Sequence, residues 1–110
     1  MKNFIQHGDS LELAAPYDVA SGAGALVGAI FGVAVATVAS GAVGVFAIEG
    51  VFDLKAKTTD TATVGAKAYW DNTNKEITTT ATGNTLVGAF TAAKASGDLV
   101  GRVLLDGVVR

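Results

Sequence analysis

The sequence contains no cysteine and a single histidine among its 110 residues. Without cysteine, neither a disulfide framework nor a thiolate metal site can form. The lone histidine, His7, stands among polar residues near the amino terminus, with no second histidine to complete a metal centre. We interpret His7 as an exposed structural residue, and we expect neither a metal nor any other cofactor.

Catalytic motifs are missing as well. The stretch Gly22–Gly28 superficially resembles the dinucleotide-binding glycine fingerprint, but it is one residue too long and leads into strand-like residues. No Gly-Lys-Ser/Thr step is present, and no serine has the context of a nucleophile elbow. Asp71 and Glu76 flank a predicted hairpin loop, where carboxylates serve turns and solubility. The sequence therefore predicts a protein that is not an enzyme.

Charge is sparse and slightly negative. Ten acidic residues outnumber eight basic ones, which gives a net charge of −2. The basic residues form no stripe or arginine cluster, so nucleic acid is not an expected partner. Residues 1–9 lack the apolar run of a signal peptide. A cysteine-free chain of this kind is compatible with assembly in a reducing cytoplasm.

The longest uncharged run, residues 19–48, would be marked by a hydropathy window as a membrane-spanning helix. Turn signals at Ser21-Gly22 and Ser40-Gly41 interrupt this run. Large and small apolar residues also alternate between positions 31 and 36, which is the period of a strand. We therefore predict strands here and no membrane partner. A small membrane protein using residues 19–48 is the competing hypothesis.

Short apolar segments separated by Gly, Asn and Asp predict an all-β fold, either a small β-barrel or a β-sandwich of short antiparallel strands. We expect an extended N-terminal arm over residues 1–10 and a single β-domain over residues 11–110. Residues 91–97 could be a loop or one helical turn. The predicted strands are Leu11–Leu13, Leu26–Phe31, Val33–Val38, Val43–Ile48, Val51–Leu54, Ala66–Trp70, Glu76–Thr80, Leu86–Phe90 and Leu99–Leu105.

Three local patterns have a bearing on this assignment. The loop Asp71–Lys75 between two strand-like segments predicts a β-hairpin, because Asp and Asn tolerate turn conformations. The polar, Thr-rich residues 55–63 predict an exposed loop. Leu26–Phe31 and Leu86–Phe90 share the letters Leu-Val-Gly-Ala, which indicates either an internal duplication or chance recurrence in an Ala/Gly/Val-rich chain.

The inventory of core residues is small. Half of the residues are apolar, but 20 of them are alanines, which bury little area. A monomer built from them would be modestly stable, so we expect association with further copies or with a partner surface. Tyr69 and Trp70 are adjacent and face opposite ways in a strand, so one of them fills the core and the other is a candidate interface anchor. A carbohydrate-binding module is an alternative, and Tyr17, Tyr69 and Trp70 would have to form its aromatic platform.

Five stretches along the chain carry a resemblance to a known family. They are Met1–Gln6, Leu26–Ala34, Glu49–Leu54, Gly65–Asp71 and Gly83–Gly88. In this order they resemble the capsid cement, or head decoration, proteins of tailed bacteriophages. Lys55 and His7 depart from that family, because proline is expected at both positions.

The resemblance implies a non-enzymatic structural protein that binds the outer surface of an assembled phage head and stabilises it. Its partners would be the major capsid protein and further copies of itself, in a homotrimer near threefold axes. It would be synthesised in the cytoplasm of the bacterial host and would reside in the virion. Lys2, Phe4 and Ile5 on the arm are candidate capsid or subunit contacts, together with Tyr69 and Trp70.

Overall fold

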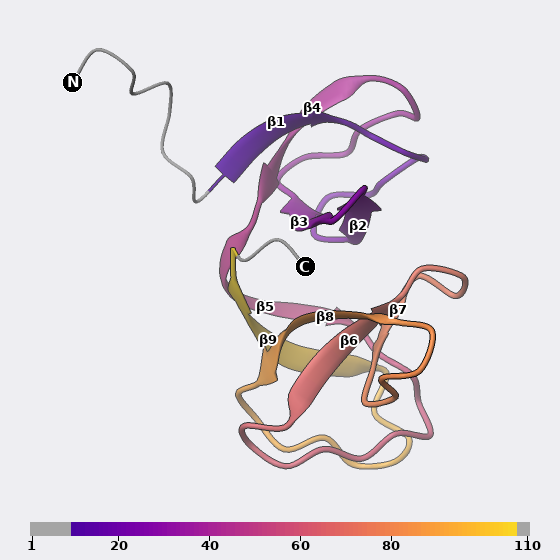
Figure 1. Cartoon of the computed structure of the whole chain (residues 1–110), viewed down its shortest axis with the longest axis vertical. Helices are drawn as coiled ribbons and strands as arrows, with labels where there is room; N and C mark the ends of the chain where they lie inside the picture. Colours follow the sequence, from indigo (N-terminus) through magenta and orange to yellow (C-terminus); the bar gives the residue numbers. More distant parts are fainter. Residues whose placement is uncertain (1–9, 108–110) are drawn as a thin grey trace, which may run out of the picture.

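The computed structural model describes residues 10–107, which form nine strands and no helix (Figure 1). The all-β prediction is confirmed. The predicted arm over residues 1–10 lies almost wholly outside the described residues, and the single-domain assignment stays a prediction. The strands are β1 (Ser10–Ala14), β2 (Gly24–Val27), β3 (Ile30–Ala34), β4 (Val43–Ala47), β5 (Glu49–Lys55), β6 (Lys67–Asp71), β7 (Glu76–Thr78), β8 (Thr85–Phe90) and β9 (Val100–Asp106).

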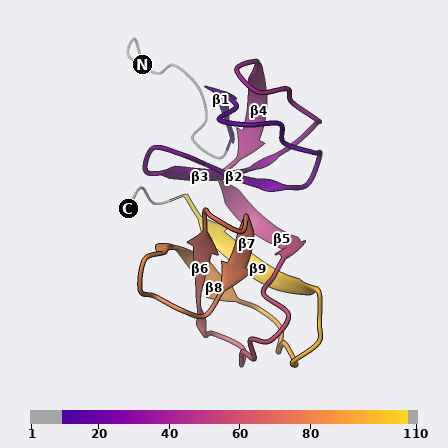
Figure 2. The same cartoon turned by 90° about the vertical axis from the view of Figure 1, so that its right-hand side faces the viewer.

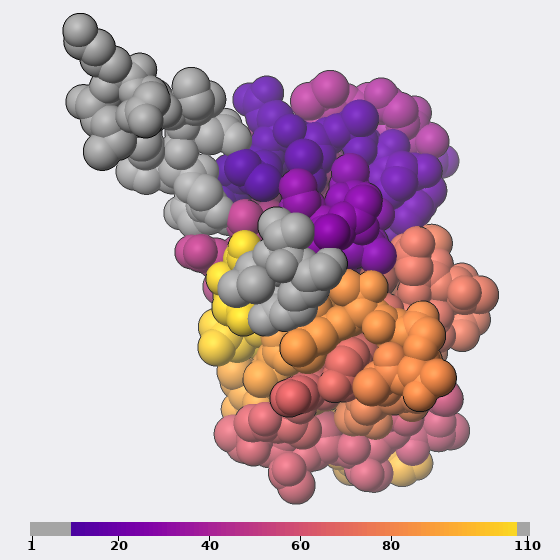
Figure 3. Space-filling model, in the orientation of Figure 1, coloured from indigo at the N-terminus to yellow at the C-terminus, as the bar shows by residue number. Residues whose placement is uncertain are grey.

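The strands form two antiparallel sheets, which we call the upper and lower sheets as Figure 1 draws them. The upper sheet has the order β1-β4-β3-β2, and the lower sheet has the order β5-β9-β8-β6-β7. Ile48 alone separates β4 from β5, so the chain passes from one sheet to the other within a single residue. Figure 3 shows the two sheets as two masses packed directly on each other.

The lower sheet curls until its two edge strands approach each other. Ala56, directly after β5, forms a parallel bridge with Ile77 of β7. The amide of Lys57 donates to the carbonyl of Ile77 at 2.8 Å. Buried and exposed residues alternate along β9, as expected for a strand with one face toward a core and one toward solvent. The lower sheet is therefore a small, partly closed barrel.

The barrel interior holds the larger of two hydrophobic clusters, which we call the lower core. Two of its members, Phe31 and Val33, come from β3 of the upper sheet. The ring of Phe31 lies against that of Trp70, with 4.9 Å between ring centroids and 49° between planes. The β2–β3 hairpin thus covers one end of the barrel, as Figure 2 shows from the side.

The second cluster lies on the opposite face of the upper sheet and is centred on Phe46 of β4, which is fully buried. Its other members are mostly small, which follows from the alanine-rich composition. Val19 and Val38 bridge the two loops that cover it, through reciprocal amide-to-carbonyl bonds of 2.9 and 2.8 Å. The upper sheet therefore contributes to both clusters, and its strand β3 is buried on both faces.

The predicted strand Leu26–Phe31 is wrong, because a turn at Gly28-Ala29 divides it into β2 and β3. Val27 and Ile30 pair across this two-residue turn. Gly28 has a φ of +60°, a left-handed conformation that glycine adopts at little cost and that tight hairpin turns require. The residues 19–48 carry β2, β3 and β4, and no helix within residues 10–107 is long and apolar enough to cross a membrane.

The structure also tests the predictions for three other local segments. The hairpin across Asp71–Lys75 is confirmed, since Asp71 pairs with Glu76 between β6 and β7. Residues 91–97 form a loop without a helical turn. Residues 55–63 were predicted as an exposed loop, but β5 extends to Lys55 and Ala56 is buried. That segment takes part in closing the barrel, which its polar composition did not indicate.

Candidate functional site

The contact residues expected from the sequence fall into two groups. Lys2, Phe4 and Ile5 lie outside the described residues, so their role stays a prediction. Tyr69 and Trp70 follow each other on β6 and therefore face opposite ways. Trp70 is buried in the lower core with 2% of its surface exposed, whereas Tyr69 is half-buried. Of this pair, Tyr69 is the residue with surface left for a partner.

The polar groups beside Trp70 build the β6–β7 turn. The indole Nε1 donates to Asn72 Oδ1 at 3.1 Å. Asp71 accepts bonds from the amides of Asn74 and Thr73 at 3.2 and 2.9 Å, and from the Asn74 side chain at 2.8 Å. The backbone amide of Asn74 contributes most to holding the pKa of Asp71 below its usual range. The carboxylate thus serves the turn, as the sequence predicted.

The aromatic platform that a carbohydrate-binding module would need is not assembled. The Tyr17 hydroxyl donates to the carbonyl of Gly24 at 2.8 Å. The ammonium of Lys75 lies 4.6 Å from the centre of the Tyr17 ring and covers it. Burial raises the pKa of the Tyr17 hydroxyl. With Trp70 in the core, Tyr17, Tyr69 and Trp70 do not share an exposed surface.

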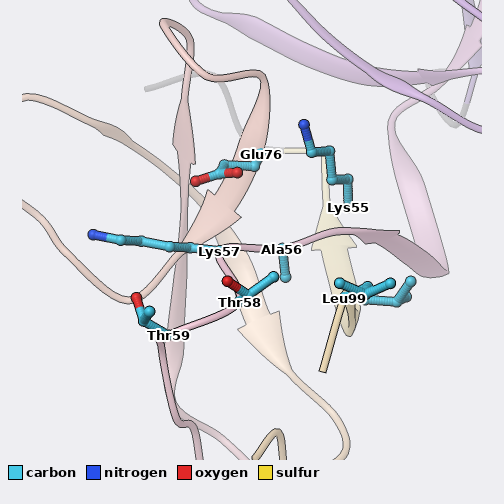
Figure 4. Close-up of a pocket in the computed structure, with 8 residues that line it drawn as sticks. Lys55, Ala56, Lys57, Thr58, Thr59, Glu76 and Leu99 are labelled. Atoms are coloured by element: carbon cyan, nitrogen blue, oxygen red, sulfur yellow. The ribbon is translucent and has the colours of Figure 1, made fainter. Parts of the chain in front are cut away.

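A pocket of about 560 Å³ lies on the outside of the barrel, where β5 ends beside β7 and the start of β9 (Figure 4). This volume falls within the range of ligand pockets, about 300–1,000 Å³. We call it the seam pocket. Sequence analysis missed it, because its walls come from three separate segments of the chain. The lining residues are Lys55, Ala56, Lys57, Thr58, Thr59, Glu76, Leu99 and Val100.

Backbone hydrogen bonds hold the walls of the seam pocket on both sides. The amide of Ala56 donates to the carbonyl of Leu99 at 3.0 Å, and the amide of Lys57 donates to Ile77 on the opposite side at 2.8 Å. The carbonyl of Thr58 accepts a bond of 2.6 Å from Gly97. The pocket is therefore formed before any partner arrives, which lowers the entropic cost of binding.

The seam pocket combines positive charge with apolar surface. Lys55 and Lys57 line the pocket with their side chains pointing in different directions, and the Glu76 carboxylate lies between the two ammonium groups in Figure 4. Within residues 10–107, neither lysine ammonium forms a hydrogen bond or an ion pair. Away from the pocket, Arg102 and Asp53 form a salt bridge of 2.9 Å on the exposed face of β9 and β5. The opposite wall is apolar, because it is formed by Leu99, whose side chain is 68% exposed.

Two polar residues outside the pocket, Asp60 and Lys94, hold the segment that contributes Thr58 and Thr59 to its lining. Asp60 accepts bonds from the hydroxyl of Thr78 at 2.6 Å and from the amide of Thr79 at 2.9 Å. Lys94 is 4% exposed, and its ammonium donates to the carbonyl of Asp60 at 2.8 Å and more distantly to that of Thr58. Because buried polar groups need such partners, these bonds lock residues 58–60 in place.

Asp60 is expected to make the stability of the fold depend on pH. Partial burial disfavours its charge, but the bonds from Thr78 and Thr79 and the nearby charge of Lys57 outweigh burial and lower its pKa. A lowered pKa contributes stability that is present above the unfolded-state value of about 4 and is lost as pH falls through the folded-state pKa.

The measurement is thermal unfolding between pH 7 and pH 2 for the wild type and Asp60→Asn. We expect the variant to be less stable by about 1 kcal/mol at pH 7 and to lose less stability on acidification. Equal losses for both proteins would contradict the role of this carboxylate.

The upper sheet leaves a second apolar surface uncovered, which we call the valine face. It comprises Val35, Val43 and Val45, whose exposed fractions range from 42% to 67%. The amide of Val35 donates to the carbonyl of Val45, so the two residues are neighbours. Ala14 and Glu12 of β1 pair with Val43 and Val45, which extends the same face. Isolated exposed valines are ordinary, but a contiguous group of them marks a surface suited to association.

Within residues 10–107 no three His, Cys, Asp or Glu side chains gather as metal ligands would.

Comparison with known proteins identifies the family. Neither the curated proteins nor the solved structures include one that matches the chain. The model of the phage cement proteins, however, matches residues 5–105, which is nearly the whole length. The chain, an all-β structure with preformed surface features, therefore belongs to the phage cement protein family.

Proposed function

We propose that this protein binds the outer surface of an assembled phage head and stabilises it, without catalysing a reaction. The observation that carries the proposal is the family match over residues 5–105. The major capsid protein is the partner, and the virion surface is the site of action after synthesis in the host cytoplasm. No specific feature of the described residues favours a carbohydrate-binding role.

Stabilisation follows from mass action. A protein that binds the intact, expanded shell but not its broken form shifts the equilibrium toward the intact shell. At a free concentration one hundred times its dissociation constant, each site contributes about 2.7 kcal/mol. Many such sites on one head together oppose the pressure of the packaged DNA.

Association into a homotrimer is part of the proposal. The uncovered valine face supports it, because a neighbouring copy would bury those valines, and the small, alanine-rich upper cluster leaves the upper sheet with little buried area of its own. A trimer would also attach at three points, so that each later contact forms at high effective concentration. Lys2, Phe4, Ile5 and Tyr69 stay the proposed subunit or capsid contacts, while Trp70 is buried in the lower core and is the weakest of the predicted contacts.

Co-sedimentation with expanded empty heads of the cognate phage, combined with light scattering of the free protein, tests this function. The expected result is saturable binding to expanded heads, weaker binding to unexpanded heads, and a solution mass three times that of one chain. A monomer that stays in the supernatant at every head concentration would refute both the capsid partner and the trimer.

A further inference from the structure

The seam pocket places unpaired positive charge on an acidic protein. The chain has more acidic than basic residues, and yet Lys55 and Lys57 meet a single carboxylate, Glu76, among the pocket residues. Lys57 is close enough to Asp60 and Asp71 to lower the pKa of both, but within residues 10–107 it forms an ion pair with neither. Neither ammonium group donates a hydrogen bond within residues 10–107, so both can donate to carboxylates of a partner.

Apolar surface adjoins these charges. Leu99 is 68% exposed and Val100 is 48% exposed, and both line the pocket. The backbone bond from Ala56 fixes Leu99 at the mouth of the pocket, where contact of its apolar side chain with water is unfavourable. Leu99 is well suited to receive an apolar side chain, since burying apolar surface against apolar surface is favourable.

We propose that the seam pocket is the capsid-binding site, and that it receives an acidic segment of the shell protein carrying an apolar anchor residue. The carboxylates of that segment lie against Lys55 and Lys57, and its anchor packs on Leu99 and Val100. The pocket belongs to the lower sheet, so it stays open when copies associate through the valine face of the upper sheet. This inference rests on the proposed function, because it names the surface by which the protein holds the head.

Two pairs of matched variants test the proposal. Lys55→Glu reverses a charge in the pocket, and Lys67→Glu makes the same change at an exposed lysine at the start of β6. Leu99→Ser removes the apolar wall, and Val64→Ser is its control, because Val64 is also 68% exposed. All four residues are exposed, so each variant is expected to fold, which circular dichroism verifies.

The readout is the dissociation constant for expanded empty heads, measured by co-sedimentation at low and at physiological salt. We expect Lys55→Glu and Leu99→Ser each to weaken binding about tenfold, which is typical of a residue that contributes to an interface without dominating it. The effect of Lys55→Glu should shrink at high salt, because a partly exposed charge pair is screened. Lys67→Glu and Val64→Ser should bind within about twofold of the wild type.

Carbodiimide coupling identifies the occupant, since this reagent joins a lysine amine to a carboxylate in direct contact. The expected product links Lys55 or Lys57 to an acidic residue of the shell protein. A product linking these lysines to a second copy of the chain, or a trimer lost in Lys55→Glu, would overturn the inference in favour of self-association. Wild-type affinity in both pocket variants would also overturn it while leaving the proposed function standing. Failure of the wild type to bind heads would overturn both.

Discussion

Replacing Trp70 with alanine is expected to lower the free energy of unfolding by about 3–5 kcal/mol. The side chain is 2% exposed and lies in the lower core, where its ring packs against Phe31 of the upper sheet. The substitution therefore leaves a cavity at the junction of the two sheets. A domain of this size has about 5–15 kcal/mol of stability in total. The substitution would therefore remove a large part of the free energy of unfolding.

Chemical denaturation at neutral pH measures this effect, and the neighbouring residue provides the control. Tyr69→Ala removes an aromatic side chain from the same strand, but from its half-buried side. We expect it to cost clearly less than Trp70→Ala. Equal costs for the two variants would mean that the contact between Phe31 and Trp70 does not join the sheets as described.

Replacing Gly88 with alanine is expected to cost about 3 kcal/mol or more, because the added methyl group meets backbone. Gly88 lies in β8, where it pairs with Leu105 of β9 on one side and with Ala68 of β6 on the other. A Cβ atom there would stand 1.9 Å from the carbonyl oxygen of Leu104. A side chain could rotate away from such a clash, but a strand cannot, so β8 and β9 would have to separate.

Gly83→Ala is the matched control for this change. Gly83 lies in the turn before β8 with a φ of +77°, and a Cβ atom added there meets nothing within 4 Å. The expected cost is about 1 kcal/mol, from the left-handed backbone alone. Thermal unfolding of both variants compares the two effects. A Gly88→Ala protein as stable as Gly83→Ala would show that the β8–β9 register differs from the one described.

Turn chemistry explains which parts of the fold could be predicted from the sequence. Asp71 and Asn74 organise the β6–β7 turn through bonds to near neighbours in the chain, so local composition was enough to find the hairpin. The repeated letters Leu-Val-Gly-Ala show the limit of such reasoning. Gly28 is the first residue of a tight turn, whereas Gly88 lies inside a strand against another backbone. The local sequence is the same, and the tertiary neighbours decide between the two structures, so the letters do not mark repeated structural units.

The seam pocket was beyond sequence reasoning for a related reason. Lys55, Glu76 and Leu99 are brought together only when the lower sheet curls and Ala56 meets Ile77. A polar, Thr-rich composition over residues 55–63 indicated a loop and nothing about its anchoring. The one visible signal was the spacing of Lys55 and Lys57, which places two like charges on the same side of an extended chain. For Trp70, the sequence indicated only that its side chain and that of Tyr69 face opposite ways. It did not indicate which of the two would be buried.

The temperature at which DNA-filled heads release their DNA tests the central claim most directly. Heads that lack this protein are measured alone and then with increasing amounts of purified protein. A cement protein that binds the intact shell predicts a release temperature that rises with added protein and levels off when the sites are filled. The Lys55→Glu variant should need about tenfold more protein to reach the same plateau. A release temperature that stays constant at saturating binding would contradict a stabilising role, whatever surface the protein occupies.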